Sequence, residues 1–348
     1  MAISSISFKS VETTNVDKNE KKVITPKVSS PGASIGAMAA GAVVHKIAPL
    51  PLASPIFDNM EKLGNLKGED GTKVHNALKQ MLEETKLKDK GVRIKFLTEN
   101  KKLFPIKVQN KDDKILRNFI EKMHILPVRR GQNAFFSAKD YKLPKITLSE
   151  YERIAKSGDT KLLAKKFNEW GILIKANSVI LPKEKLHTAG FHELGHALNY
   201  NFSSIGKFLQ KCRPLSMFAP MVLGIYGAVT KKSKPKQEGQ DLGGKQKFNN
   251  FLRDNAGKLA FIAGLPMLIE EGMATVKGNS FAKKLLSPEL ASRVSKGNGV
   301  AYCTYALVAI FGALAARVAV GIKDNAIEKK EIKAQNEARI KAELAEVV

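Results

Sequence analysis

The chain repeats apolar residues with two different periods, which predict helices and strands in different places. Apolar positions three and four residues apart lie on one face of a helix, whereas strict alternation fits a half-buried strand. The helical period predicts helices at 74–87, 111–125 and 186–198, and the capping residues Ser149 and Asp159 predict two more at 147–157 and 159–170. Alternating or short apolar runs predict strands at 91–97, 134–137, 145–148, 172–174 and 179–181. We therefore expect an α+β fold that is mostly helical, with a small sheet.

Three apolar stretches stand out in the second half of the chain. Pro214–Thr230 has 17 residues without a charge, Leu259–Ile269 has 11 and includes Pro266, and Gly297–Ala316 has 20. A helix needs about 20 apolar residues to cross the hydrocarbon core of a membrane. Gly297–Ala316 is therefore the best candidate for a span, and a buried alanine-rich helix in a soluble protein is the alternative. The two shorter stretches would form an apolar hairpin.

The rest of the chain divides by composition. Residues 1–30 have no helical or strand period and predict a disordered tail. The small-residue run Pro31–Val44 is short for a span and predicts an interfacial helix, a hairpin or a loose linker. Residues 233–250 are rich in Gly, Gln and Lys, which is typical of a loop. The expected divisions are a tail with a small apolar segment (1–58), a mixed α/β soluble region (59–178), a core with the apolar hairpin (179–296), a transmembrane helix candidate (297–322) and a charged helical tail (323–348).

Basic residues outnumber acidic ones by 58 to 33, which gives the chain a net charge of +25. So large an excess indicates an anionic partner. Anionic membrane lipid fits better than nucleic acid, because the lysines are spread along the chain and flank its apolar runs. The two cysteines, Cys212 and Cys303, have neither metal-ligand spacing nor a disulfide pattern. We expect a multi-pass membrane protein, whose orientation the flanking charges do not fix.

One short segment carries the candidate chemistry. His192, Glu193 and His196 form the pattern H-E-x-x-H within the helix predicted at 186–198. Residues four apart lie one turn apart on the same face of a helix, so the two imidazoles can bind one Zn²⁺. Glu193 is placed to act as a general base on water at the metal. The segment predicts a hydrolytic zinc site if a third ligand exists; the alternative is a surface helix with two solvated histidines.

The third ligand is best sought at Glu270 and Glu271, two adjacent carboxylates within an apolar run. Burying them is costly unless they are paired or bind a metal. A hairpin between His196 and Glu271 would return these carboxylates to the motif helix, whereas a single membrane crossing would separate them from it. The other candidates are Glu238, Asp241 and His187.

The motif and its context resemble the gluzincin group of zinc metallopeptidases, in which H-E-x-x-H is followed downstream by a ligand Glu. Glu271-Gly272-Met273-Ala274 is similar to the E-G-x-A segment of gluzincin aminopeptidases. With Asn199, the motif reads H-E-x-x-H-x-x-N and resembles the HtpX-like and CAAX-processing membrane metallopeptidases. The resemblance covers residues 179–280. It implies a zincin-like core, in which the motif histidines and Glu271 hold zinc and Glu193 is the catalytic base.

The chain departs from the pattern of these membrane peptidases at two positions. Thr275 stands where their E-x-x-A-D segment has Asp, and Asn201 stands where they often have His or Asp. In zincins the strand beside the motif helix pairs with the substrate backbone, which implies this role for Ser178–Leu181. No residue is marked as stabilising an oxyanion; the candidates are Tyr200, Tyr226 and His187.

These patterns favour a membrane-associated metallopeptidase that uses Zn²⁺ to hydrolyse peptide bonds in a peptide or protein substrate. The alternative is an inactive membrane scaffold that keeps the fold, because Thr275 replaces a carboxylate that would orient a ligand. A basic nucleic-acid-binding protein ranks third, and no nucleic-acid partner is expected.

Overall fold

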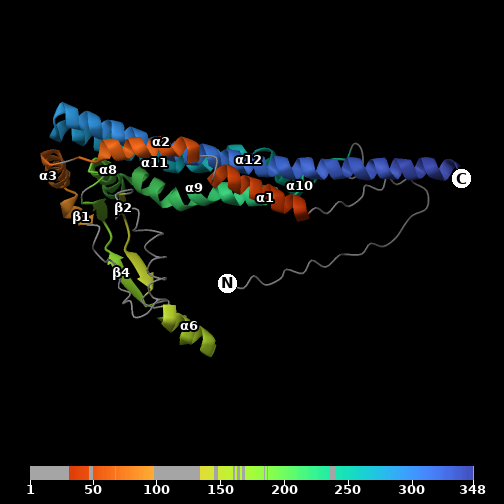
Figure 1. Ribbon diagram of the computed structural model, residues 1–348, viewed down its shortest axis with the longest axis horizontal. Coiled ribbons are helices and arrows are strands. Elements are labelled where there is room, and N and C mark those ends of the chain that lie inside the picture. The colour runs from red at the N-terminus through yellow and green to blue at the C-terminus, as the bar shows by residue number, and fades with distance from the viewer. Residues whose placement is uncertain are drawn as a thin grey trace.

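The computed structural model combines a bundle of long helices with a small sheet near one end (Figure 1). Helix α12 runs along the bundle, and the sheet lies near the end where this helix begins (Figure 1). The structure describes residues 31–46, 50–66, 68–97, 134–144, 148–159, 161–162, 165–166, 169–183, 185, 187–235 and 240–347. The predicted tail at 1–30 and the helix at 111–125 lie outside these residues, as do 145–147 of the predicted strand and 160, 163–164 and 167–168 of the helix predicted at 159–170. The described ends of the last two predictions differ from them, because Leu148 begins a helix and Trp170 begins a strand.

Helices make up most of the described chain, as the apolar periods predict. They are α1 (Pro31–Lys46), α2 (Leu50–Gly64), α3 (Glu69–Glu84), the 3₁₀ turn η1 (Lys88–Lys90), α6 (Leu148–Ser157), α8 (Ala189–Phe202), α9 (Ser204–Val229), α10 (Gly244–Asp254), α11 (Ala256–Leu285) and α12 (Pro288–Val347). The strands are β1 (Arg93–Leu97), β2 (Phe135–Ser137), β3 (Tyr141–Pro144), β4 (Trp170–Ile174) and β5 (Ser178–Pro182).

Strand β5 lies in the middle of a three-stranded sheet and leads into α8. It pairs parallel to β1 and antiparallel to β2, so that Val179 faces Ile94 on one side and Phe136 on the other. The prediction that Ser178–Leu181 offers a free edge to a substrate is therefore wrong, because both edges of β5 are already paired. Among the described strands of this sheet, β1 and β2 are the outer ones. Strands β3 and β4 form a separate antiparallel pair.

Helices α9 and α11 are neighbouring antiparallel helices that are much longer than the apolar runs that predict them. Arg213 in the first half of α9 contacts Glu271 in the middle of α11, while Gly227 near the end of α9 binds Arg253 just before α11. Pro266 does not end α11, which has 30 residues. A proline removes one helical hydrogen bond, and packing between neighbouring helices can offset that loss.

Within the described residues, three helices are long and apolar enough to cross a membrane: α9, α11 and α12. Large apolar side chains on α9 point outward, and Leu215, Phe218 and Val222 are more than half exposed. The contacts between helices are made by small residues, in clusters that contain Ala256, Ala260, Ala316 and Val320, and Ala37, Ala228 and Ala319. Small residues inside and large apolar residues outside are typical of helices packed in lipid. The arrangement indicates a membrane protein.

Two segments form regular helices that composition did not clearly predict. One had three alternative predictions, and the other was predicted as a loop. The small-residue run Pro31–Val44 lies within α1, which packs against α12 through Ala37 and Ala319 rather than forming a loose linker. The loop predicted at 233–250 is wrong in its second half, because α10 begins at Gly244. The side chain of Gln246 accepts a hydrogen bond from the Gly243 amide and caps this helix. Helix α12 continues without a break through Gly297–Ala316 into the charged tail.

Candidate metal centre

Helix α8 holds the H-E-x-x-H motif inside the protein. All of its residues from Gly190 to Asn199 are buried, and His192 and His196 are 4% and 3% exposed. The alternative of a surface helix with solvated histidines is therefore wrong. Buried imidazoles need polar partners, and these come mainly from α11.

The backbones of α8 and α11 touch at two glycines, and the two contacts lie on either side of His192. A β-carbon on Gly278 would lie 2.5 Å from the carbonyl oxygen of Phe191 and 3.0 Å from the amide nitrogen of His192. A β-carbon on Gly195 would overlap the carbonyl group of Ala274. Only glycine allows so close an approach. The close crossing brings the carboxylates of α11 to the histidines of α8.

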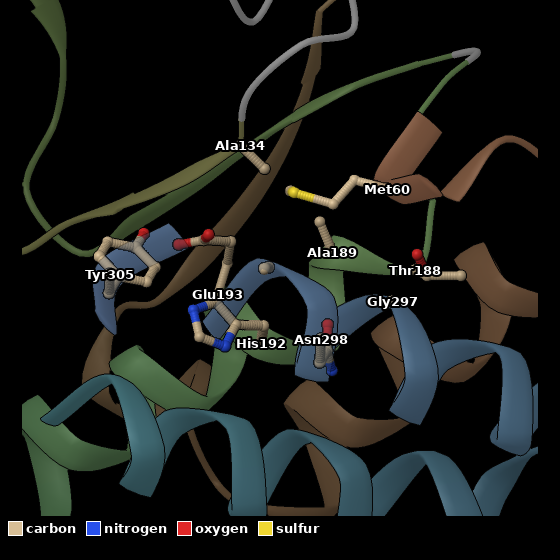
Figure 2. A pocket seen from close by; sticks show the side chains of 10 residues that line it. Met60, Ala134, Thr188, Ala189, His192, Glu193, Gly297, Asn298 and Tyr305 are labelled. Atoms are coloured by element: carbon tan, nitrogen blue, oxygen red, sulfur yellow. The ribbon is translucent and has the colours of Figure 1, made fainter. Parts of the chain in front are cut away.

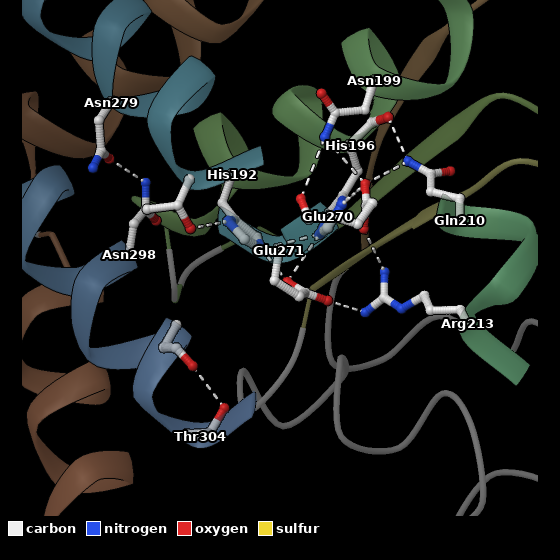
Figure 3. A network of polar contacts seen from close by, with 12 residues as sticks. His192, His196, Asn199, Gln210, Arg213, Glu270, Glu271, Asn279, Asn298 and Thr304 are labelled. Carbon is white, nitrogen blue, oxygen red and sulfur yellow. Dashed lines mark hydrogen bonds and ion pairs between the residues drawn. The ribbon is translucent and has the colours of Figure 1, made fainter. Parts of the chain in front are cut away.

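Three potential ligand atoms converge between these helices (Figure 3). The Nε2 atoms of His192 and His196 are 3.0 Å apart. The Oε2 atom of Glu271 lies 3.0 Å from the first and 3.3 Å from the second. Glu271 is fully buried. Two buried groups within this cluster could hold a metal ion: His192, Glu193 and His196 form one, and His196, Glu270 and Glu271 form the other.

The other nitrogen of each histidine has its own partner, which leaves both Nε2 atoms directed at Glu271. His196 Nδ1 lies 2.8 Å from Oε1 of Glu270, and His192 Nδ1 lies 3.1 Å from the hydroxyl oxygen of Thr275. Carboxylates and hydroxyls in this position fix the tautomer and orientation of a metal-binding histidine. Glu270 therefore orients His196, while Glu271 lies where the two Nε2 atoms meet. Thr275 occupies the orienting position despite lacking a carboxylate.

Helix α9 adds a second set of partners for the two carboxylates (Figure 3). Gln210 donates hydrogen bonds of 2.8 Å to Glu270 Oε1 and to the backbone oxygen of His196. Arg213 Nη1 lies 3.4 Å from Glu270 Oε2, and its Nη2 contacts Glu271 Oε1. Asn199 on α8 donates a further bond of 3.1 Å to Glu270 Oε1. These contacts hold both carboxylates in fixed positions.

The charges of the cluster leave a deficit that a divalent cation would balance. Glu193, Glu270 and Glu271 are all buried, and among the described residues Arg213 is the cation in direct contact with them. Burial alone would lower the pKa of His196, but the charge of Glu271 and the hydrogen bonds to both carboxylates raise this pKa to about 10. Without a metal, a proton on His196 supplies part of the missing positive charge. With neutral imidazoles, two negative charges would remain.

A small cavity of about 60 Å³ opens beside the histidines (Figure 2). Its lining includes His192 and Glu193 from α8 and Asn298 and Tyr305 from α12. The Glu193 carboxylate and the Tyr305 ring lie at the same end of the cavity, and Met60 lies across from them (Figure 2). A cavity of this size has room for a few water molecules.

The remaining candidate residues lie apart from the cluster. His187 accepts a hydrogen bond from the Leu66 amide and packs against His75. The other partners are Phe136 for Tyr200, Asn249 for Tyr226, Ala197 for Asn201 and Lys247 for Asp241. Glu238 lies outside the described residues. No sequence pattern singles out Gln210, Arg213 or Tyr305, because their roles depend on how α9 and α12 pack.

No protein-family model, curated protein or solved structure matches the chain. The fold and the cluster therefore define its class by themselves. They define a mostly helical membrane protein with a small sheet and a buried His/Glu cluster that could hold a metal ion.

Proposed function

We propose that the protein is a multi-pass, membrane-embedded zinc metallopeptidase that hydrolyses peptide bonds. The observation that carries this proposal is the convergence of His192 Nε2, His196 Nε2 and Glu271 Oε2 at separations of 3.0, 3.0 and 3.3 Å. Tetrahedral zinc with ligands at about 2.0–2.2 Å requires its ligand atoms to be about 3.3–3.6 Å apart. The three atoms thus need to separate by only a few tenths of an ångström.

The donor set also fits zinc by its chemistry. Two imidazole nitrogens and one carboxylate oxygen make a common set of three protein ligands in hydrolytic zinc enzymes, in which a fourth position stays open. If each histidine carries its proton on Nδ1 and donates it to Glu270 or Thr275, both Nε2 atoms are left with lone pairs. The two Nε2 atoms and the Glu271 oxygen are then three hydrogen-bond acceptors in contact, with no hydrogen between them. Such a meeting is favourable only around a cation. The resemblance to gluzincins and to HtpX-like peptidases leads to the same assignment.

The residues around the cavity can divide the hydrolytic steps among them. Bound zinc would polarise a carbonyl and lower the pKa of water. Glu193 would accept the proton of the attacking water and pass it to the leaving amine. The Tyr305 hydroxyl, at the same end of the cavity, would donate a hydrogen bond to the oxygen that gains charge (Figure 2).

Metal analysis of wild-type protein and of three variants tests the proposal. We expect one zinc per wild-type chain, retention of zinc in Glu193→Gln, and weakened or lost zinc in Glu271→Ala. Asp241→Ala is the matched control, because this exposed carboxylate pairs with Lys247 away from the cluster. Cleavage of a peptide library should need both zinc and Glu193. A wild-type chain that binds no zinc after purification without chelators would refute the assignment.

A metal-binding scaffold without activity is the second candidate, and the size of the cavity favours it. About 60 Å³ does not accommodate a peptide segment unless α2 or α12 moves. This function predicts full zinc content and no cleavage of the library by wild-type protein or by Glu193→Gln.

A further inference from the structure

Helix α10, the connection between α9 and α11, has its polar face inward and its apolar face outward. Phe248 and Phe251 are three residues apart on one face and are 60% and 53% exposed. Asn249 accepts a 2.8 Å hydrogen bond from the Tyr226 hydroxyl, and Asn250 donates one of 2.9 Å to the Ser233 backbone oxygen. In water, a helix gains free energy from the opposite orientation. The observed orientation is favourable where the surroundings of the helix are apolar.

The chain around α10 is strongly basic. Residues 230–258 contain eight basic and three acidic side chains. Lys231, Lys245 and Lys247 are exposed on the connection and on α10. Exposed lysines beside exposed aromatic rings suit a surface that has both anionic and apolar groups.

The position of α10 along the bundle matches the boundary of a membrane. Arg253, which is fully buried, donates to the backbone oxygens of Gly227 and Thr230 at 2.7 and 2.6 Å and so closes the end of α9. Arg213, at the metal cluster, lies 17 residues before Thr230 on the same helix. Seventeen residues of helix span about 26 Å, close to the roughly 30 Å of a hydrocarbon core. The C-terminal end of α10, where Arg253 lies, is therefore about one hydrocarbon thickness away from the cluster.

We propose that α10 is an interfacial helix that binds the anionic headgroup layer of the leaflet opposite the metal cluster. Phe248 and Phe251 enter the boundary of the acyl chains, and Lys231, Lys245 and Lys247 contact lipid phosphates. The inference rests on the proposal that α9 and α11 cross the membrane; it does not depend on zinc or on hydrolysis.

Tryptophan fluorescence of the full chain in lipid nanodiscs tests the depth of α10. Phe248→Trp, in a Trp170→Phe background, supplies the only tryptophan of the chain. We expect quenching by phospholipids brominated on their acyl chains and weak quenching by acrylamide. Ile340→Trp is the matched control, because Ile340 is 51% exposed on the charged end of α12 and should show the reverse. Equal acrylamide quenching in the two variants, without quenching by brominated lipid, would overturn the proposal in favour of a protein partner.

Selectivity for anionic lipid is tested by moving the bromine between lipids. In mixed nanodiscs, phosphatidylglycerol should be about fivefold enriched around α10 over phosphatidylcholine. Quenching of the Phe248→Trp variant by the brominated form of each lipid measures this ratio. One lysine at an anionic surface contributes about 1 kcal/mol, which corresponds to about fivefold. Replacing Lys231, Lys245 and Lys247 by Gln should remove this excess and preserve quenching by phosphatidylcholine. Equal quenching by both lipids in the chain that keeps its lysines would overturn the anionic partner. A chain that fails to enter nanodiscs would overturn the proposal that α9 and α11 cross the membrane, and with it the role of α10. The zinc content and the cleavage of peptides are measured in separate assays, so a failure of the proposed metallopeptidase activity is distinguishable from a failure of this inference.

Discussion

Replacing Gly278 by Ala should disrupt the buried His/Glu cluster without changing any of the proposed metal ligands. The added β-carbon would lie 2.5 Å from the carbonyl oxygen of Phe191 and 2.7 Å from the carbonyl carbon. An unstrained contact requires about 3.5 Å, so α8 and α11 must separate by about 1 Å. Because both atoms in the clash belong to backbone near His192, rotation of a side chain cannot relieve it.

A separation of about 1 Å should weaken metal binding strongly and lower the stability of the fold moderately. Ligand distances in metal sites hold to within about 0.2 Å, so a shift of about 1 Å takes Glu271 out of reach of the two Nε2 atoms. We expect metal affinity to fall by at least the roughly 10- to 100-fold that follows the loss of a residue that orients a ligand. Stability should fall by about 1–3 kcal/mol, as for overpacking.

Gly272→Ala is the matched control for this prediction. Gly272 lies in the same helix directly after Glu271, and a β-carbon there would find its nearest neighbour, an atom of the Tyr302 ring, at 3.6 Å. This variant should bind metal normally and gain up to about 1 kcal/mol of stability from helix propensity. Competition with a chromogenic chelator gives the affinities, and thermal unfolding gives the stabilities. Normal affinity in Gly278→Ala, or equal losses in the two variants, would refute the argument from close helix packing.

Three further predictions concern groups around the cluster and in α3. Thr275→Val should lower zinc affinity about 10- to 100-fold, because His192 loses its orienting partner, and Thr275→Asp should restore it in the same chelator assay. Arg213→Met should destabilise the metal-free protein by about 3 kcal/mol, because buried carboxylates lose their cation, and added zinc should raise its melting temperature more than that of wild type. Burial and the neighbouring His187 lower the pKa of His75 from 6.5 to about 4. The unfolded chain therefore binds more protons between these values, so stability should be full above pH 6.5 and fall by about 1–2 kcal/mol toward pH 4, after allowance for solvent screening of this half-buried ring. His75→Phe should remove that part of the pH dependence of unfolding.

The sequence predicts the parts of the site that depend on local spacing. His192, Glu193 and His196 lie on one short amphipathic helix, so their arrangement follows from helical geometry alone. The pair Glu270 and Glu271 is notable as two adjacent charges in an apolar run, which limits the third ligand to a few candidates. Which of the two meets both histidines depends on the rotation of α11 against α8, and the close contacts at glycines fix that rotation. This long-range packing has no signature in the local pattern.

Sheet order and helix length depend on the same kind of long-range packing. A continuous apolar strand such as β5 can be an edge strand or a central strand, and only pairing with β1 and β2 decides between them. A proline inside a helix is unfavourable by local chemistry alone, but α11 continues through Pro266 as one helix packed among its neighbours. Composition predicts a loop in place of α10 because Gly, Gln and Lys dominate the segment. The exposed face of this helix is marked by two Phe only three residues apart, and one such pair is too short to show a helical period.

The His/Glu cluster and the bundle of apolar helices form one structure rather than two adjacent modules. Helix α8 supplies the histidines, α11 the carboxylates and α9 the arginine, and α12 contributes Tyr305 to the cavity wall. Three of these four helices are those that, within the described part of the chain, are long and apolar enough to cross a membrane. Any change of lipid thickness that tilts α9 against α11 therefore alters the contacts of Arg213 with Glu270 and Glu271. The geometry of the cluster should respond to the membrane around the bundle as directly as to the residues that line the cavity.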